Sequence, residues 1–134
     1  MTVKWTEELS VGIDVIDAQH KELFSTAESL LAAVERGGGQ GEVTKVVAFL
    51  EEYVETHFQT EEMYMKRYSY PDYGPHKLEH TGFVNKFYDL RQELDNDGVS
   101  PDLTVRLADW VGDWLVNHIG RMDKALATFL KGRK

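Results

Sequence analysis

Several residue types that support common functional sites are missing from this chain or scarce in it. The chain has no cysteine, which excludes disulfide bonds, catalytic thiolates, zinc ribbons and cysteine-bound iron–sulfur clusters. Positive charge is scarce, because 15 basic residues stand against 23 acidic ones and give a formal net charge of −8. We therefore expect no binding to nucleic acid, which needs a basic surface. Any metal ion would have to be bound through nitrogen and oxygen.

Long apolar segments are also missing. No apolar run approaches the ~18 residues of a membrane span, and the start of the chain, from Met1 to Glu8, lacks the apolar core of a signal peptide. These features predict a cytoplasmic protein without membrane insertion. The length of 134 residues suits one domain, and we expect it to cover residues 1–134.

Hydrophobic residues recur with helical spacing along nearly the whole chain. Four helices are predicted, at about 17–36, 41–68, 75–94 and 101–118. Asp17 and Ser100 are the expected N-caps of the first and fourth helices, and Pro75 is the expected first residue of the third. Because the loops are short, the pattern favours an all-α fold, an up-down-up-down antiparallel four-helix bundle. A non-helical N-terminal arm, residues 1–16, should pack along the bundle, and a short helical tail should end at Gly132.

The inward faces of the helices carry all five histidines of the chain. The expected inward residues of the first two helices are His20, Phe24, Ala27, Leu31 and Val34, then Val43, Val47, Leu50, Val54, His57, Glu61 and Met65. Those of the third and fourth are His76, His80, Phe83, Phe87, Leu90 and Leu94, then Leu103, Leu107, Trp110, Trp114 and His118.

Two pairs of these polar residues have the spacing of one helical turn. His57 and Glu61 are four residues apart, as are His76 and His80, so each pair shares one helix face. A single histidine on an apolar face is usually an ordinary core residue with a hydrogen-bond partner. Burying five imidazoles and two acids without a metal, however, would leave unpaired polar groups that cost about 1–3 kcal/mol each. The set therefore predicts two metal ions inside a helix bundle.

Asp123 fits this set least well by spacing. It follows His118 by five residues, a rotation of ~500° along an ideal helix, which leaves it ~140° away from His118. Gly120 could loosen the turn between them. The alternative is a solvated acid that precedes Lys124.

The seven residues, in this order and at these gaps, resemble the hemerythrin family and in particular its single-domain bacterial members. The resemblance extends over nearly the whole chain. It includes the segments 14–21 (DVIDAQHK), 70–71 (YP) before His76, and 114–119 (WLVNHI) around His118.

The resemblance implies a non-haem di-iron site. His76, His80 and His118 would bind one iron, and His20 and His57 the other. Glu61 and Asp123 would bridge both irons together with an oxo or hydroxo group. A count of ligand atoms then leaves one coordination position open, on the iron with two histidines, where O2 would bind and be held as hydroperoxide. Phe58, Leu115 and Ile119 are the candidate walls of this pocket, with plain core packing as the alternative.

The function implied by the resemblance is reversible O2 binding for carriage, storage or delivery, in a protein that is not an enzyme. A reductase or an oxygen-consuming enzyme is the expected protein partner. Two alternatives remain, a sensor of O2 or redox state and an enzyme that reduces peroxide or nitric oxide at the same iron. Iron storage is disfavoured, because the site takes only two metal ions.

Overall fold

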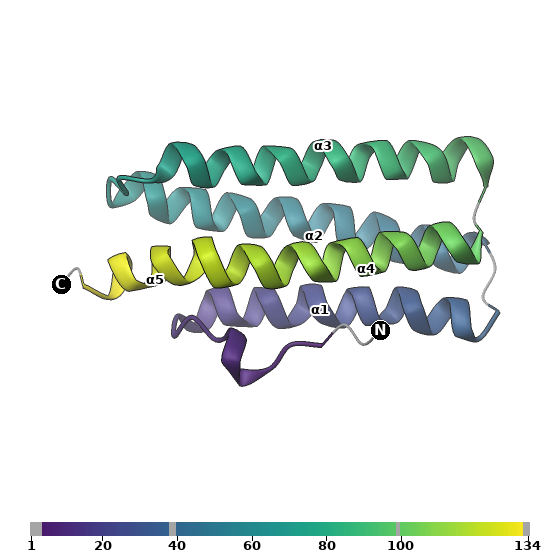
Figure 1. Cartoon of the computed structure of the whole chain (residues 1–134), viewed down its shortest axis with the longest axis horizontal. Helices are drawn as coiled ribbons and strands as arrows, with labels where there is room; N and C mark the ends of the chain where they lie inside the picture. The colour runs from purple at the N-terminus through teal and green to yellow at the C-terminus, as the bar shows by residue number, and fades with distance from the viewer. Residues whose placement is uncertain (1–3, 38–39, 99, 133–134) are drawn as a thin grey trace.

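The computed structural model describes residues 4–37, 40–98 and 100–132 and consists of long helices packed side by side (Figure 1). The four long helices are α1 (Asp14–Glu35), α2 (Gln40–Arg67), α3 (Tyr73–Asp97) and α4 (Pro101–His118). A π-helical turn, η2 (Ile119–Asp123), joins α4 to the short α5 (Lys124–Lys131). Of the predicted glycine connection after α1, Gly38 and Gly39 lie outside the described residues.

The four long helices alternate in direction along the chain, and α5 continues the direction of α4, as Figure 1 shows. α1 packs against α2 and α4, and α3 packs against the same two helices, so the four helices enclose one core. The predicted antiparallel four-helix bundle with a helical tail is confirmed. Within the described ranges, no helix is both long and apolar enough to cross a membrane.

The helix ends follow local chemistry, with two corrections to the predicted starts. Ser100 caps α4 as predicted, because its side-chain oxygen accepts a hydrogen bond from the backbone N–H of Leu103 at 3.1 Å. α3 begins at Tyr73, so Pro75 is its third residue and not its first. A proline is still tolerated there, because the first-turn N–H groups have no partner within the helix.

The second correction concerns Asp17, which is not an N-cap. α1 begins at Asp14, and Asp17 lies within its first turn. The Asp17 carboxylate instead accepts hydrogen bonds from the backbone N–H of Val11 at 2.8 Å and from the Ser10 hydroxyl at 2.6 Å. The acid therefore fastens the N-terminal arm to α1.

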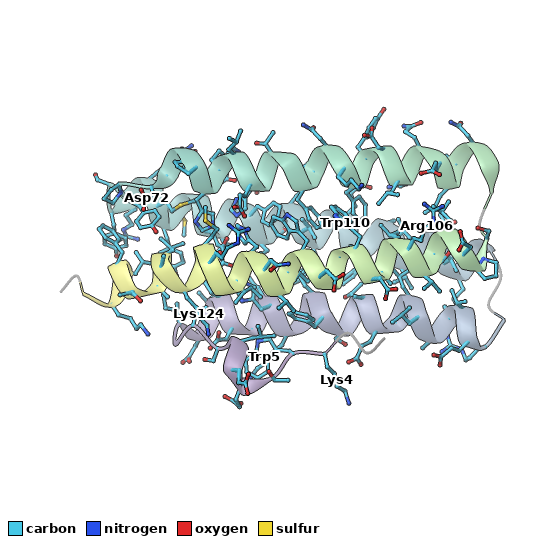
Figure 2. The ribbon with its side chains drawn as sticks, in the orientation of Figure 1. Lys4, Trp5, Asp72, Arg106, Trp110 and Lys124 are labelled. Carbon is cyan, nitrogen blue, oxygen red and sulfur yellow. The ribbon has the colours of Figure 1, made fainter. Side chains whose placement is uncertain are left out.

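The N-terminal arm packs along the bundle, as expected. Val11 is buried, and the arm contains one 3-10 turn, η1 (Glu7–Leu9), that the sequence did not predict. Trp5, labelled in Figure 2, is packed against the core. The Lys21 ammonium lies 4.5 Å from the centre of its ring. The arm thus covers part of the bundle surface.

The predicted inward faces of α2 and α3 are buried at every position. In α1 the prediction fails in the second half, because Leu31 and Val34 are only half-buried. Leu30 and Ala33, one residue earlier in each case, are fully buried there. Both sets of positions continue the helical spacing of three or four residues, so the spacing does not show which set faces inward. The packing of α1 against α2 and α4 determines it.

Candidate metal centre

The seven polar side chains singled out in the sequence meet inside the bundle. Each is at most 1% exposed to solvent. They are His20 from α1, His57 and Glu61 from α2, His76 and His80 from α3, His118 from α4, and Asp123 from η2. Burial of so many ionisable groups at one point needs a compensating partner.

Their ligand atoms form two overlapping groups, each with all atoms within 4.8 Å of one another. We call the first the three-histidine position; it consists of His76, His80, His118, Glu61 and Asp123. The second, the two-histidine position, consists of His20, His57, Glu61 and Asp123. Both carboxylates therefore belong to both positions.

Each carboxylate directs one oxygen toward each position. Asp123 Oδ1 lies 3.1 Å from His76 Nε2, and Asp123 Oδ2 lies 3.0 Å from His20 Nε2. Glu61 Oε1 likewise lies 3.3 Å from His76 Nε2, and Glu61 Oε2 lies 3.5 Å from His57 Nε2. This is the arrangement that two carboxylates need in order to bridge two adjacent cations.

Asp123 reaches the cluster because the helix changes its pitch. In η2 the backbone N–H of Lys124 bonds to the carbonyl of Ile119, five residues back, which is the π-helical pattern. The wider turn brings the fifth residue back to the face of His118, and His118 Nε2 lies 3.1 Å from Asp123 Oδ1. The solvated alternative for Asp123 is wrong. Gly120, which the sequence suggested could loosen the turn between His118 and Asp123, lies inside η2.

Three imidazoles donate their outer N–H to side chains that the sequence analysis missed. The Nδ1–H groups of His57, His80 and His118 donate to Gln19 Oε1 at 2.7 Å, Glu62 Oε2 at 2.9 Å and Glu79 Oε1 at 2.9 Å. Each acceptor directly precedes or follows a cluster residue in the sequence. That adjacency is the signal by which they could have been found.

These hydrogen bonds test whether the cluster suits a cation. A neutral imidazole that carries its proton on Nδ1 has a lone pair on Nε2, here directed into the cluster. His80 Nε2 faces His118 Nε2 at 3.2 Å, and both of these rings donate their Nδ1–H outward. Lone pairs that face each other need a proton or a cation between them. Glu61 Oε2 and both Asp123 oxygens also have no hydrogen-bond partner among the described residues, so the donor set fits metal ions.

The charges in the cluster also favour added positive charge. Burial acts to lower the pKa of His118 and His20, but the adjacent carboxylates of Asp123 and Glu61 prevail and raise these values to about 10 and about 9. At His57 burial prevails and lowers the pKa to about 4. Burial acts to raise the pKa of Asp123, yet the surrounding imidazoles lower it to about 2. Without a metal, protons on imidazoles balance the two carboxylates.

Aromatic and aliphatic side chains surround the cluster. The Phe58 ring stacks on the His80 ring with 3.9 Å between centroids, and Trp114 stacks on His118 at 4.3 Å. Leu115 and Ile119, the other two candidate wall residues, are buried in the same core. The cluster therefore lies in a water-poor environment.

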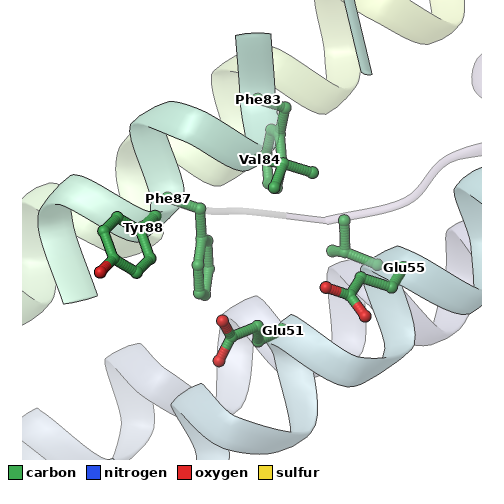
Figure 3. Close-up of a pocket in the computed structure, with 7 residues that line it drawn as sticks. Glu51, Glu55, Phe83, Val84, Phe87 and Tyr88 are labelled. Carbon is green, nitrogen blue, oxygen red and sulfur yellow. The ribbon is translucent and has the colours of Figure 1, made fainter. Parts of the chain in front are cut away.

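Two surface pockets lie between α2 and α3. One of about 210 Å³ is lined in part by Phe58, Glu62, Lys77 and His80, so it reaches the outer side of the three-histidine position. The other, of about 140 Å³, is lined by residues of α2 and α3 only (Figure 3): Glu51, Val54, Glu55, Phe83, Val84, Phe87 and Tyr88. None of the seven cluster residues lines this second pocket.

Fold and cluster together define a class, the antiparallel four-helix bundle with an internal histidine–carboxylate centre. The chain belongs to the hemerythrin family, because residues 11–130 match the family model described as the hemerythrin HHE cation binding domain. Membership in this family implies a non-haem iron site.

Individual relatives agree with this assignment. The chain is 34% identical to the bacteriohemerythrin of Methylococcus capsulatus, with 90% of each chain covered. It is 29% identical to the myohemerythrin of Sipunculus nudus, with 89% of this chain and 86% of the relative covered. A solved structure described as wild-type hemerythrin superposes with a TM-score of 0.86 at 29% identity, covering 96% of this chain and 97% of that one.

Proposed function

We propose that this protein binds O2 reversibly at a non-haem di-iron centre. The three-histidine and two-histidine positions would each hold one iron, and Glu61 and Asp123 would bridge them together with an oxo or hydroxo group. Bound ferrous ions would supply the electrons that O2 takes up on binding. The observation that supports this most strongly is that both carboxylates have one oxygen near each group of histidines.

O2 would bind on the side of the two-histidine position, because His20 and His57 provide one imidazole fewer than the other group. The fully buried cluster excludes bulk water, which limits irreversible oxidation of a bound metal. Phe58, Leu115 and Ile119 would help to keep the site dry.

A binding protein fits the residues around the site better than an enzyme does. All five histidines of the chain lie in the cluster, so none is left to act as a separate general acid or base. The relatives described above carry the names of hemerythrins and not of enzymes. Reversible binding would suit carriage, storage or delivery of O2, and the proposed protein partner is a reductase or an oxygen-consuming enzyme.

The test is a visible spectrum of the iron-loaded, reduced protein while O2 is admitted and then removed. We expect a charge-transfer band that appears with O2 and disappears on its removal over repeated cycles. The matched control is Glu93→Gln, which removes an exposed carboxylate outside the cluster and should leave the cycles unchanged. One-way conversion to a ferric spectrum would point instead to sensing or catalysis, and the absence of any band would refute the di-iron centre.

A further inference from the structure

The two positions of the centre differ in the side chains that accept hydrogen bonds from the outer Nδ1–H groups of their imidazoles. In the three-histidine position, His80 and His118 both donate Nδ1–H to a carboxylate, Glu62 and Glu79 respectively, at 2.9 Å. These carboxylates lie at the bundle surface but are largely covered, with side chains 13% and 26% exposed. Two of the three imidazoles thus face a negative charge.

In the two-histidine position, no carboxylate of the described residues accepts a hydrogen bond from the outer side of an imidazole. His57 donates Nδ1–H to the neutral amide oxygen of Gln19 at 2.7 Å, and Gln19 Nε2 in turn donates to Thr60 Oγ1 at 3.1 Å. The Nδ1 atom of His20, like that of His76 in the three-histidine position, is buried and has no hydrogen-bond partner in the described part of the chain. This half is therefore held by neutral groups alone.

Basic side chains at the surface hold the two outer carboxylates in position. Lys77 Nζ donates to Glu62 Oε1 at 2.9 Å, while Glu62 Oε2 accepts from the imidazole. Arg121 donates to both oxygens of Glu79, at 2.9 and 3.3 Å. Each carboxylate is thus held from two sides, which orients the imidazole that donates to it.

Such partners change how strongly an imidazole binds a metal. A carboxylate that accepts the Nδ1–H bond makes Nε2 a stronger electron donor and fixes the ring orientation, whereas a neutral amide does so less. Glu61 and Asp123 cannot distinguish the two positions, because both belong to each. Any difference in affinity must come from the histidines and their outer partners.

We propose that Glu62 and Glu79 are positioning residues that make the three-histidine position the tighter of the two cation positions and the first to be filled. This inference rests on the proposed metal centre and adds an order of assembly to it. The two-histidine position, held by Gln19, is then the weaker one and fills second.

The experiment uses Zn²⁺ as a diamagnetic probe added to the metal-free full-length protein. Long-range proton–nitrogen NMR spectra report the state of all five imidazoles separately. With the first equivalent of Zn²⁺, we expect the resonances of His76, His80 and His118 to shift to their final values. Those of His20 and His57 should follow only with the second equivalent. First filling of the two-histidine position, or equal filling of both, overturns the inference.

Charge-neutral variants then separate positioning from simple folding. Glu62→Gln and Glu79→Gln keep the shape and the acceptor oxygen, and each should weaken the first Zn²⁺ equilibrium roughly tenfold to hundredfold. Gln19→Glu should tighten the second equilibrium by a similar factor. Glu93→Gln, which removes an exposed acid outside the centre, should change neither.

Three results have different meanings. Unchanged affinities in the Glu62 and Glu79 variants, with the parent still binding two Zn²⁺, would refute the positioning role but leave the proposed centre intact. Absence of Zn²⁺ binding by the parent would refute the centre itself. If either variant fails to fold, Lys77→Gln loosens Glu62 without removing it and should still weaken the first equilibrium; an unchanged value would count against the inference.

Discussion

The π-helical turn η2 leads to a prediction about the length of the segment between His118 and Asp123. Deleting Gly120 would place Asp123 four residues after His118, as Glu61 follows His57. Four residues of α-helix turn ~400°, which returns the side chain to within about 40° of His118. We therefore expect the deletion to convert η2 into α-helix while Asp123 stays in the cluster.

Inserting one alanine after Gly120 should have the opposite effect. The extra residue rotates Asp123 by about 100°, and at a side-chain radius of ~5 Å this moves the carboxylate by roughly 8 Å. The oxygens now lie 3.0 to 3.1 Å from three imidazole nitrogens, so such a displacement removes them from both positions. One bridging carboxylate would be lost.

The assay is the number of divalent cations bound per chain, measured by titration of the metal-free protein and by metal analysis after dialysis. The deletion should retain two cations with affinities within about tenfold of the parent, a change of roughly 1.4 kcal/mol. The insertion should lose at least one, with the helix content by circular dichroism little changed. A deletion variant that loses a cation, or an insertion variant that keeps both, would refute the helical reasoning.

Protonation, core packing and helix capping each lead to a further measurable outcome. The pKa values of His118 and His20 are raised to about 10 and about 9, and the pKa of His76 is also raised. His118 and His20 therefore hold protons at pH 7, and metal binding should release at least two protons. Calorimetry in buffers of different ionisation enthalpy measures this release, which should fall as the pH rises through 9; no release at pH 7 would contradict the charge balance. Phe58→Ala should lower the free energy of unfolding by about 3–5 kcal/mol in urea denaturation, because a buried ring is removed, and a loss below about 1 kcal/mol would show that its packing was overestimated. Ser100→Ala should cost about 1 kcal/mol through loss of the α4 cap, whereas Ser29→Ala, which changes an exposed hydroxyl within α1, is the matched control.

The bundle could be predicted from the chain because its signals are local. The apolar residues of α2 and α3 keep helical spacing without interruption, and Ser100 with Pro101 marks a helix start in any context. Where the local signal was ambiguous, the prediction failed. Asp17 is a residue type that often caps helices, but here its carboxylate accepts a hydrogen bond from the backbone N–H of Val11 in the N-terminal arm.

The centre was predicted in part. His57 with Glu61, and His76 with His80, share helix faces by spacing alone, and family resemblance joined the remaining residues to them. Adjacency to Glu61 and His80 marks Glu62 and Glu79 as candidate partners, but it does not say which imidazole each one accepts from, because those hydrogen bonds cross between helices, from α3 to Glu62 and from α4 to Glu79.

The sequence by itself thus determined the helices and the residue types available to a metal, because periodicity and side-chain chemistry are properties of the chain. Helical spacing did not place Asp123 on the face of His118; the π-helical turn η2, seen only in the tertiary structure, explains how it reaches the cluster. The tertiary structure also decided which half of the centre is held by carboxylates and which by an amide. Those choices depend on the relative rotation of packed helices, and no local pattern in the chain encodes that rotation.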